Sequence, residues 1–296
     1  MRRPTTVELM LLVTVVLWAL NLTVTRTILT SGMAPLSYAA VRYGLAALIF
    51  LALTLVAERT LRILRSDVPA ALLAAATIFL NQIAFVYALE TTTASTVGLI
   101  LGATPIFAGL LGLVLGTETP SARFWLGAVV SFAGVGLVAL GAGEIEGGLG
   151  GIGLGVATAA TWAAYSVIIA PLMRRYSPFR ISALVLSLGW VPIALVALPQ
   201  LSDQDWALGW DIWLLLAFAT LGPLVLTNVL WFRSLHRIGP ARATLAANLQ
   251  PFVAALFAVV LLSEEVTLLQ VAGGVLIAAG ILVARRSGPL RAPRAE

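Results

Sequence analysis

Neutral polar side chains interrupt the long apolar runs of this chain. Amides and hydroxyls both donate and accept hydrogen bonds, so they suit a zwitterion or a polar neutral solute. Two tryptophans, whose N–H groups need partners when buried, could add an aromatic wall. Hydrogen bonding between helices and simple space filling remain the alternatives. The candidate binding residues are Trp18, Asn21, Gln82, Thr104, Trp162, Tyr165, Asn228 and Asn248.

Residues for bond-breaking chemistry are missing from the apolar runs. The chain has no cysteine and one histidine, His236, so an H-E-x-x-H zinc motif or a buried Ser–His pair cannot form. No Asp or Glu stands in the middle of an apolar run, which removes an aspartyl pair and a carboxylate that exchanges a proton for a cationic drug. We therefore expect no enzyme, no cofactor and no metal site.

The composition requires a lipid bilayer as solvent. Hydrophobic residues make up 60% of the 296 residues and charged residues 10%, whereas soluble domains carry roughly 25% charged residues. A helix crosses a bilayer with about 20 apolar residues. The apolar runs predict ten spans, at roughly 7–29, 36–56, 68–88, 94–115, 122–141, 149–171, 179–199, 211–232, 241–262 and 266–285.

Arginine placement predicts the orientation of these spans. With the N-terminus in the cytoplasm, all of the 18 basic residues except Arg26 and Arg42 fall in cytoplasmic segments. The charged residues of the outer loops are all acidic. This is the positive-inside pattern, so both termini are predicted to be cytoplasmic. It also accounts for the net charge of +5 without nucleic acid. The first apolar run lacks an A-x-A-like cleavage site and is interpreted as a retained helix.

Arg42 is a charged residue inside the predicted span 36–56. Three interpretations remain open for it: a structural ion pair, a cavity group that attracts a substrate carboxylate, or snorkelling toward the membrane surface. For Arg26, near the outer end of the first span, we favour snorkelling.

Two segments of the chain match each other. GATPIFAGLLGLVLGTET (102–119) and NLQPFVAALFAVVLLSEE (248–265) share a proline, Pro105 or Pro251, and a glutamate, Glu118 or Glu264, at the same spacing. The chain therefore divides into two five-helix halves, 1–146 and 147–296. Five is odd, so the second half is inverted, a recurrent transporter design with its substrate site at the midplane. A mid-helix proline bends a helix, and paired kinks suggest a central cavity.

Glycines recur at helix-packing spacings in both halves. Gly127 and Gly134 correspond to Gly273 and Gly280. Small residues let membrane helices approach closely, so we interpret these glycines as packing positions, with a dimer interface as the alternative. The sequence thus allows a monomer or a homodimer. The short loops that follow spans 4 and 9 predict that each of these spans packs as a hairpin with the next one.

The chain resembles the drug/metabolite transporter superfamily in its EamA-type ten-helix branch. The stretches that carry this resemblance are LWALNLTVTR (17–26), APLSYAAVRYGLAALIF (34–50), ALETTTASTVGLILGATPIFAGLLGLVLGTET (88–119), TWAAYSVIIAP (161–171) and SLHRIGPARATLAANLQPFVAALFAVVLLSEE (234–265). Within the branch it is most similar to amino-acid exporters of the YddG type.

The resemblance implies an all-α protein of the bacterial inner membrane, with one EamA-like repeat in each half. It implies export of small metabolites, with aromatic or neutral amino acids as the first expectation and alternating access as the mechanism. A multidrug or cationic-compound exporter is the alternative, and a non-transporting scaffold or receptor is a remote one. The expected partners are the substrate and the lipid bilayer.

Overall fold

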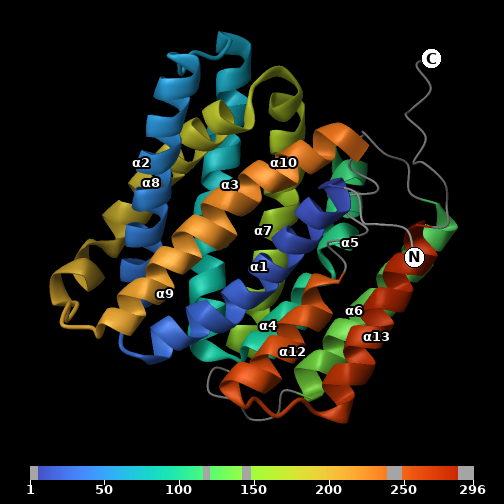
Figure 1. Ribbon diagram of the computed structural model, residues 1–296. Helices are drawn as coiled ribbons and strands as arrows, with labels where there is room; N and C mark the ends of the chain where they lie inside the picture. Colours follow the sequence, from blue (N-terminus) through green and yellow to red (C-terminus); the bar gives the residue numbers. More distant parts are fainter. Residues whose placement is uncertain (1–5, 116–120, 142–147, 239–248, 286–296) are drawn as a thin grey trace, which may run out of the picture.

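A computed structural model describes residues 6–115, 121–141, 148–238 and 249–285, and all regular secondary structure in this part of the chain is helical. Figure 1 shows the helices, which are α1 (Thr6–Thr30), α2 (Pro35–Glu58), α3 (Val68–Thr91), α4 (Ala94–Leu101), α5 (Thr104–Val114), α6 (Ala122–Gly141), α7 (Gly148–Arg175), α8 (Pro178–Asp203), α9 (Trp210–Thr220), α10 (Thr227–Ile238), α12 (Gln250–Leu262) and α13 (Leu268–Arg285). A 3₁₀ turn, Arg65–Asp67, precedes α3, and a π-helical segment, Leu221–Leu226, joins α9 to α10.

Local signals explain where several helices begin. Proline stands in the first turn of α2, α3 and α8, where its missing N–H has no intrahelical partner to lose. Two helices also carry a side-chain cap: Thr93 accepts a hydrogen bond from the Thr96 N–H, and Ser177 accepts one from the Arg180 N–H. Between these signals, the backbone N–H and C=O groups form hydrogen bonds within each helix, because lipid offers them no hydrogen-bond partners.

The described helices overlap the predicted spans, but not all of them are long enough to cross a membrane. Six segments are long and apolar enough to cross a membrane by themselves, and α4 with α5 forms a seventh if the pair is one bent span. The helices α6, α12 and α13 are apolar but shorter. The described part of the ninth predicted span begins only at Leu249. The chain is thus an all-helical, multi-pass membrane protein.

Prolines stand in the first turn of two helices that begin inside predicted spans. The break between α4 and α5 bends the chain by 41°, and Pro105 lies in the first turn of α5. The predicted kink at Pro105 is therefore a complete break, in which the proline begins a new helix. Pro251 likewise lies in the first turn of α12. The span Trp210–Ser234 continues as one helix, but the π-helical segment around Pro223 interrupts its regular α-helical hydrogen bonding, and we call this interruption the helix break.

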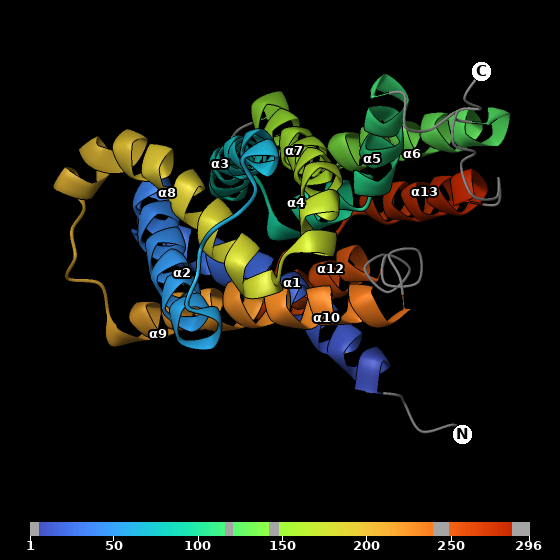
Figure 2. The ribbon, with the colours of Figure 1, turned by 90° about the horizontal axis from the view of Figure 1, so that it is seen from above.

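The two halves of the chain interlock rather than lie apart. Helix α2 packs along α8, α3 along α7, and α6 along α13. Each of these pairs joins one helix from the first half to one from the second, and α6 and α13 lie side by side at one end of the molecule in both views (Figures 1 and 2). The buried core accordingly draws on residues from both halves, from Ala19 to Ala258.

Glycines allow the closest of these approaches. A Cβ atom added to Gly134 of α6 would lie 2.6 Å from the Gly273 carbonyl oxygen and 2.8 Å from the Ile277 amide nitrogen of α13. Gly127 and Gly280 meet backbone of the opposite helix in the same way. The four predicted packing glycines therefore form one interface within the chain. The predicted hairpins are wrong in this respect, because the main partner of α6 is α13 and not α5.

Candidate functional site

Four aromatic rings from three helices meet inside the bundle. Trp18 of α1 lies edge-on to Trp162 of α7, with ring centroids 6.1 Å apart. Trp231 of α10 approaches Trp18 to 5.1 Å, and Tyr165 approaches Trp162 to 5.4 Å. The structure therefore brings together three of the predicted residues, Trp18, Trp162 and Tyr165, and adds Trp231. We call these four residues the aromatic group.

The indole of Trp18 is held by a hydrogen-bond relay. Its Nε1–H donates to the Thr227 hydroxyl at 2.9 Å, and that hydroxyl donates to the Pro223 carbonyl at 2.5 Å. In a regular α-helix this carbonyl would accept from the Thr227 amide, but the π-helical turn directs that amide to Gly222 instead. The hydroxyl thus satisfies a carbonyl that the helix break displaces.

Arg42 is buried beside the same break. The side chain is 4% exposed, and its Nε–H donates to the Ala219 carbonyl at 3.2 Å. In an α-helix this carbonyl would accept from the amide of residue 223, which is a proline and has no N–H. The rings of Tyr38 and Tyr43 lie 5.6 and 6.0 Å from the guanidinium carbon. No ion pair joins Arg42 to an acidic residue in the part of the chain that the structure describes.

Buried amides lie on α1 and α3. The Asn81 amide donates to the Thr158 carbonyl and the Thr161 hydroxyl, and its oxygen accepts from Gln82. The Gln82 Oε1 and the Asn21 Oδ1 are buried and have no hydrogen-bond partner among the described residues. A buried polar atom without a partner is costly. These two oxygens therefore lack the hydrogen bond that a buried amide oxygen usually has.

The remaining predicted binding residues have different environments. Asn228 is buried and follows Thr227 directly, at the end of the π-helical segment. Thr104 uses its hydroxyl locally, because it donates to the Leu101 carbonyl at the break between α4 and α5. Asn248 lies outside the described residues.

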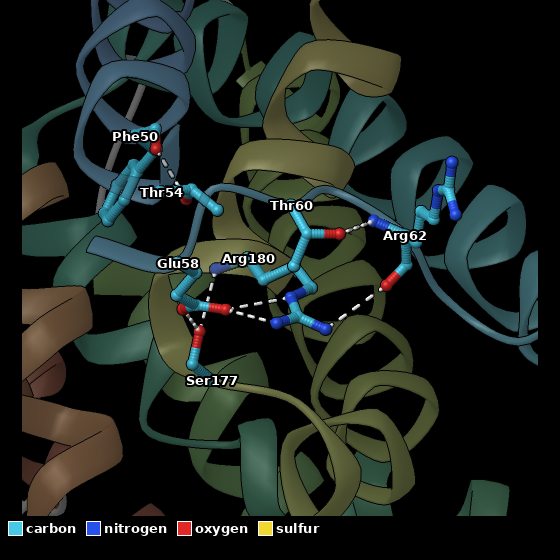
Figure 3. A network of polar contacts seen from close by, with 7 residues as sticks. All are labelled: Phe50, Thr54, Glu58, Thr60, Arg62, Ser177 and Arg180. Carbon is cyan, nitrogen blue, oxygen red and sulfur yellow. Dashed lines mark hydrogen bonds and ion pairs between the residues drawn. The ribbon is translucent and has the colours of Figure 1, made fainter. Parts of the chain in front are cut away.

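At one end of the bundle, charged side chains join the two halves. Glu58, at the end of α2, accepts two hydrogen bonds from the Arg180 guanidinium of α8 at 2.6 and 2.9 Å, and it also accepts one from the Ser177 hydroxyl (Figure 3). Next to this network, Asp67 accepts hydrogen bonds from Arg175 and Tyr176, each at 2.6 Å. We call these two networks the charged clasp.

Neutral and acidic side chains join the halves at the opposite end. Gln200 and Gln204, near the end of α8, accept hydrogen bonds from the Leu36 and Ala34 amides at the start of α2. Glu264 accepts hydrogen bonds from the Ala94 and Ser95 amides and from the Ser95 hydroxyl at the start of α4. Cross-half contacts therefore join the helices at both ends of the bundle.

A cavity in the described part of the chain lies away from these residues and is apolar. It measures about 230 Å³ and is bounded by the end of α4, the start of α12 and one side of α13. Its lining includes Leu99, Pro251, Phe252, Ile277 and Leu282, and no charged side chain. Such a lining offers a polar solute no side-chain hydrogen bonds, so we place the candidate site at the aromatic group.

A comparison with protein-family models identifies the family of this chain. The model of the EamA-like transporter family matches residues 5–140 and again residues 149–286. The chain belongs to the EamA-like transporter family. This family is part of the drug/metabolite transporter superfamily and is not enzymatic. Two copies of the domain support the duplication that the matched prolines and glutamates predict.

Individual relatives agree with this assignment. The uncharacterized transporter YyaM of Bacillus subtilis (strain 168) is 26% identical over 88% of this chain and 87% of its own length. The uncharacterized transporter YdeK of the same organism is 31% identical over 67% of this chain and 69% of its own length. A third, YdfC, is 27% identical, and that match spans 62% of YdfC. A crystal structure with 20% identity superposes with a TM-score of 0.68 over 95% of this chain and 98% of its own, so the fold is shared.

Sequence reasoning missed part of the site. Thr227, Tyr43 and Ala219 were not singled out, because a threonine, a tyrosine or an alanine in an apolar span is not unusual by itself. One signal was available: Gly222-Pro223 stands in the middle of the predicted span 211–232. A proline at that position displaces carbonyls, which then need donors from elsewhere.

Proposed function

We propose that this EamA-family protein exports amino acids with aromatic or neutral side chains by alternating access around the aromatic group. The observation that carries the proposal is the contact between Trp18 and Trp162, one from each half, next to a helix break. The rings offer an apolar surface to a side chain. The free oxygens of Asn21 and Gln82 can accept hydrogen bonds from an ammonium group.

The proposal includes the membrane arrangement. Ten spans form two inverted five-helix repeats, 1–146 and 147–296, with both termini in the cytoplasm of a bacterial inner membrane. The arginine distribution and the doubled family match support this arrangement. The similarity to YddG-type exporters, which the residues suggest, points to the same substrate class. The direction of transport follows from that similarity.

The mechanism uses the contacts at the two ends. The charged clasp closes one end, and the contacts of Gln200, Gln204 and Glu264 close the other. Transport requires each end to open in turn while the other stays closed. We infer that the clasp faces the cytoplasm, because it contains arginines of the predicted inner loops, and that substrate enters after it opens.

A cationic-compound exporter is the second candidate. Tryptophan faces attract cations, and the Asn21 and Gln82 oxygens are acceptors that a cationic amine could use. The buried Arg42 argues against a cationic substrate, because its positive charge would repel a cation. The two candidates differ in what they require: a proton-coupled drug exporter needs an imposed pH gradient, whereas amino-acid efflux down its own gradient does not.

Transport by purified protein in liposomes tests the proposal. Vesicles receive labelled phenylalanine, leucine, aspartate or a cationic dye, each with and without a pH gradient. We expect saturable phenylalanine efflux without a gradient, reduced at least tenfold in Trp18→Ala and Gln82→Ala. Trp210→Phe is the control, because Trp210 is 76% exposed and lies outside the aromatic group. Dye flux that needs the pH gradient, without amino-acid flux, would contradict the proposal.

A further inference from the structure

The buried guanidinium of Arg42 has too few partners. Arginine remains charged in proteins and carries five N–H donors. Within the described chain its one hydrogen bond runs from Nε to the Ala219 carbonyl, a neutral acceptor at 3.2 Å. A buried charge without a counter-charge is strongly unfavourable. The terminal nitrogens of the guanidinium, in a residue that is 4% exposed, are therefore available to an anion.

The Ala219 carbonyl takes the place of a carboxylate as the hydrogen-bond acceptor of the Arg42 guanidinium. It is available because Pro223 has no amide to donate to it, and it therefore competes for one edge of the guanidinium. A carboxylate would bind that edge better than a carbonyl, because two parallel charge-assisted hydrogen bonds match the planar fork. The break in the helix thus places a weak, displaceable acceptor next to the unpaired cation.

Arg42 is connected to the aromatic group. Both Arg42 and Trp18 are hydrogen-bonded to the helical segment around Pro223: the Arg42 Nε–H donates to the Ala219 carbonyl, and the Trp18 Nε1–H donates to the Thr227 hydroxyl, about two helical turns further along. Tyr43, whose ring lies 6.0 Å from the guanidinium carbon, and Tyr165 of the aromatic group also belong to one buried cluster. A solute at the aromatic group would therefore have Arg42 at one side and the free oxygens of the amides on α1 and α3 as separate acceptors.

We propose that the Arg42 guanidinium is the subsite for the carboxylate of the transported solute, and that the Ala219 carbonyl occupies part of it when no solute is bound. The inference rests on the proposed function and narrows it: the solute carries a carboxylate, and an amine without one is discriminated against. Arg42 is then the residue that determines charge specificity.

Binding to the purified full chain in detergent tests this subsite separately from transport. Tryptophan fluorescence is titrated with 3-phenylpropanoate, which has a carboxylate and no amine, and with phenethylamine, which has an amine and no carboxylate. We expect Arg42→Gln to weaken 3-phenylpropanoate binding roughly 10- to 100-fold, the usual cost of a lost charged hydrogen bond. Phenethylamine binding should not weaken. Arg42→Lys should give a smaller loss, because it keeps the charge without the fork.

Two further variants sharpen the test. Arg26→Gln is the matched control, because Arg26 also donates to backbone carbonyls, those of Leu89 and Glu90, but lies away from the aromatic group. Pro223→Ala gives residue 223 an amide that can bond the Ala219 carbonyl and release Arg42. We therefore expect Pro223→Ala to tighten 3-phenylpropanoate binding, by up to about tenfold.

Several results would overturn the subsite. The subsite is overturned if the wild-type protein does not bind 3-phenylpropanoate. It is also overturned if a well-folded Arg42→Gln variant binds 3-phenylpropanoate as the wild type does, or if this variant loses affinity equally for both probes. If Arg42→Gln aggregates, the decision rests on Arg42→Lys, whose loss must be confined to the carboxylate probe. Arg42-dependent binding in a protein that fails to transport amino acids would uphold the subsite and overturn the proposed function instead.

Discussion

Single residues carry the candidate site, and hydroxyl groups decide how its larger side chains are held. The Trp18 indole is fixed by Thr227 and not by the backbone directly. Thr227 can accept from the indole because its own hydrogen is given to the Pro223 carbonyl. The position of the ring in the first half therefore depends on a helix break in the second half.

Replacing Thr227 tests this dependence. Thr227→Val keeps the shape of the side chain but leaves both the Trp18 N–H and the Pro223 carbonyl unpaired. We expect substrate affinity in fluorescence titrations to fall about fivefold to tenfold, which corresponds to one neutral hydrogen bond. Thr227→Ser keeps the hydroxyl and should retain wild-type affinity. Equal losses in the two variants would contradict the relay.

The sequence predicts residue types at the site better than it predicts their contacts. Trp18 and Trp162 are recognisable because both interrupt apolar runs and occupy matching places in the two halves. Their partner Trp231 is not recognisable in this way, because it stands near the end of the predicted span 211–232, where an ordinary interfacial tryptophan would stand. For Arg42, the sequence leaves an ion pair open, whereas its partner in the described chain is a backbone carbonyl. Which carbonyl is free depends on a break more than a hundred residues away.

At the scale of the helices, glycines and breaks determine which elements meet. Helix lengths and boundaries are largely predictable, because they follow apolar runs and prolines. Helix partners are less predictable, as the loop lengths favour hairpins within each half, whereas glycine faces bring α6 and α13 together. A short loop restricts where a chain can go, but close backbone contact decides which pairing is more stable in lipid.

A pair of alanine substitutions on α6 tests the glycine interface. The Cβ atom of Gly134→Ala would lie within 2.6–2.8 Å of α13 backbone atoms, so the helices must separate. We expect a loss of about 1–3 kcal/mol in the free energy of unfolding. Gly136→Ala is the control, since nothing lies within 4 Å of its Cβ position. This change should be neutral or stabilise by up to about 1 kcal/mol. Reversible unfolding in detergent measures both.

Helix α4 begins at a carboxylate from the other half. Glu264 accepts two backbone amides and one hydroxyl at its start, where the helix dipole favours negative charge. Glu264→Ala should lower the free energy of unfolding by about 1–2 kcal/mol. Glu265→Ala, at the exposed neighbouring position, should change it by less than about 0.5 kcal/mol. Similar effects of the two variants would mean that the cap contributes nothing.

At the scale of the whole molecule, the two halves are joined at both ends. Between the ends, helices of one half pack against helices of the other. The Glu58–Arg180 ion pair of the charged clasp is largely shielded from water, with side chains 18% and 21% exposed. Shielded pairs are screened less than surface pairs, and breaking one leaves a charge without its partner. The clasp therefore joins α2 to α8 more firmly than an ordinary surface ion pair would.

A charge swap tests the clasp. Glu58→Arg and Arg180→Glu should each destabilise the protein, and each should raise the labelling of a cysteine at Gln82 by a thiol reagent added from the clasp side. The double variant restores opposite charges and should recover part of both effects, with a coupling of roughly 0.5–3 kcal/mol. Purely additive effects would show that Glu58 and Arg180 do not act as a pair.

The pairing of α6 with α13 also affects how the chain is made. A ribosome delivers α6 to the bilayer long before α13 has been synthesised. In that interval the glycine face of α6 is uncovered, and it resembles the faces through which separate membrane helices associate. The last helix to be inserted thus completes a contact that the nascent protein has had to leave open. A premature stop codon just before α13 would yield a product prone to pair with the wrong neighbours, and cellular quality control would recognise it as unfinished.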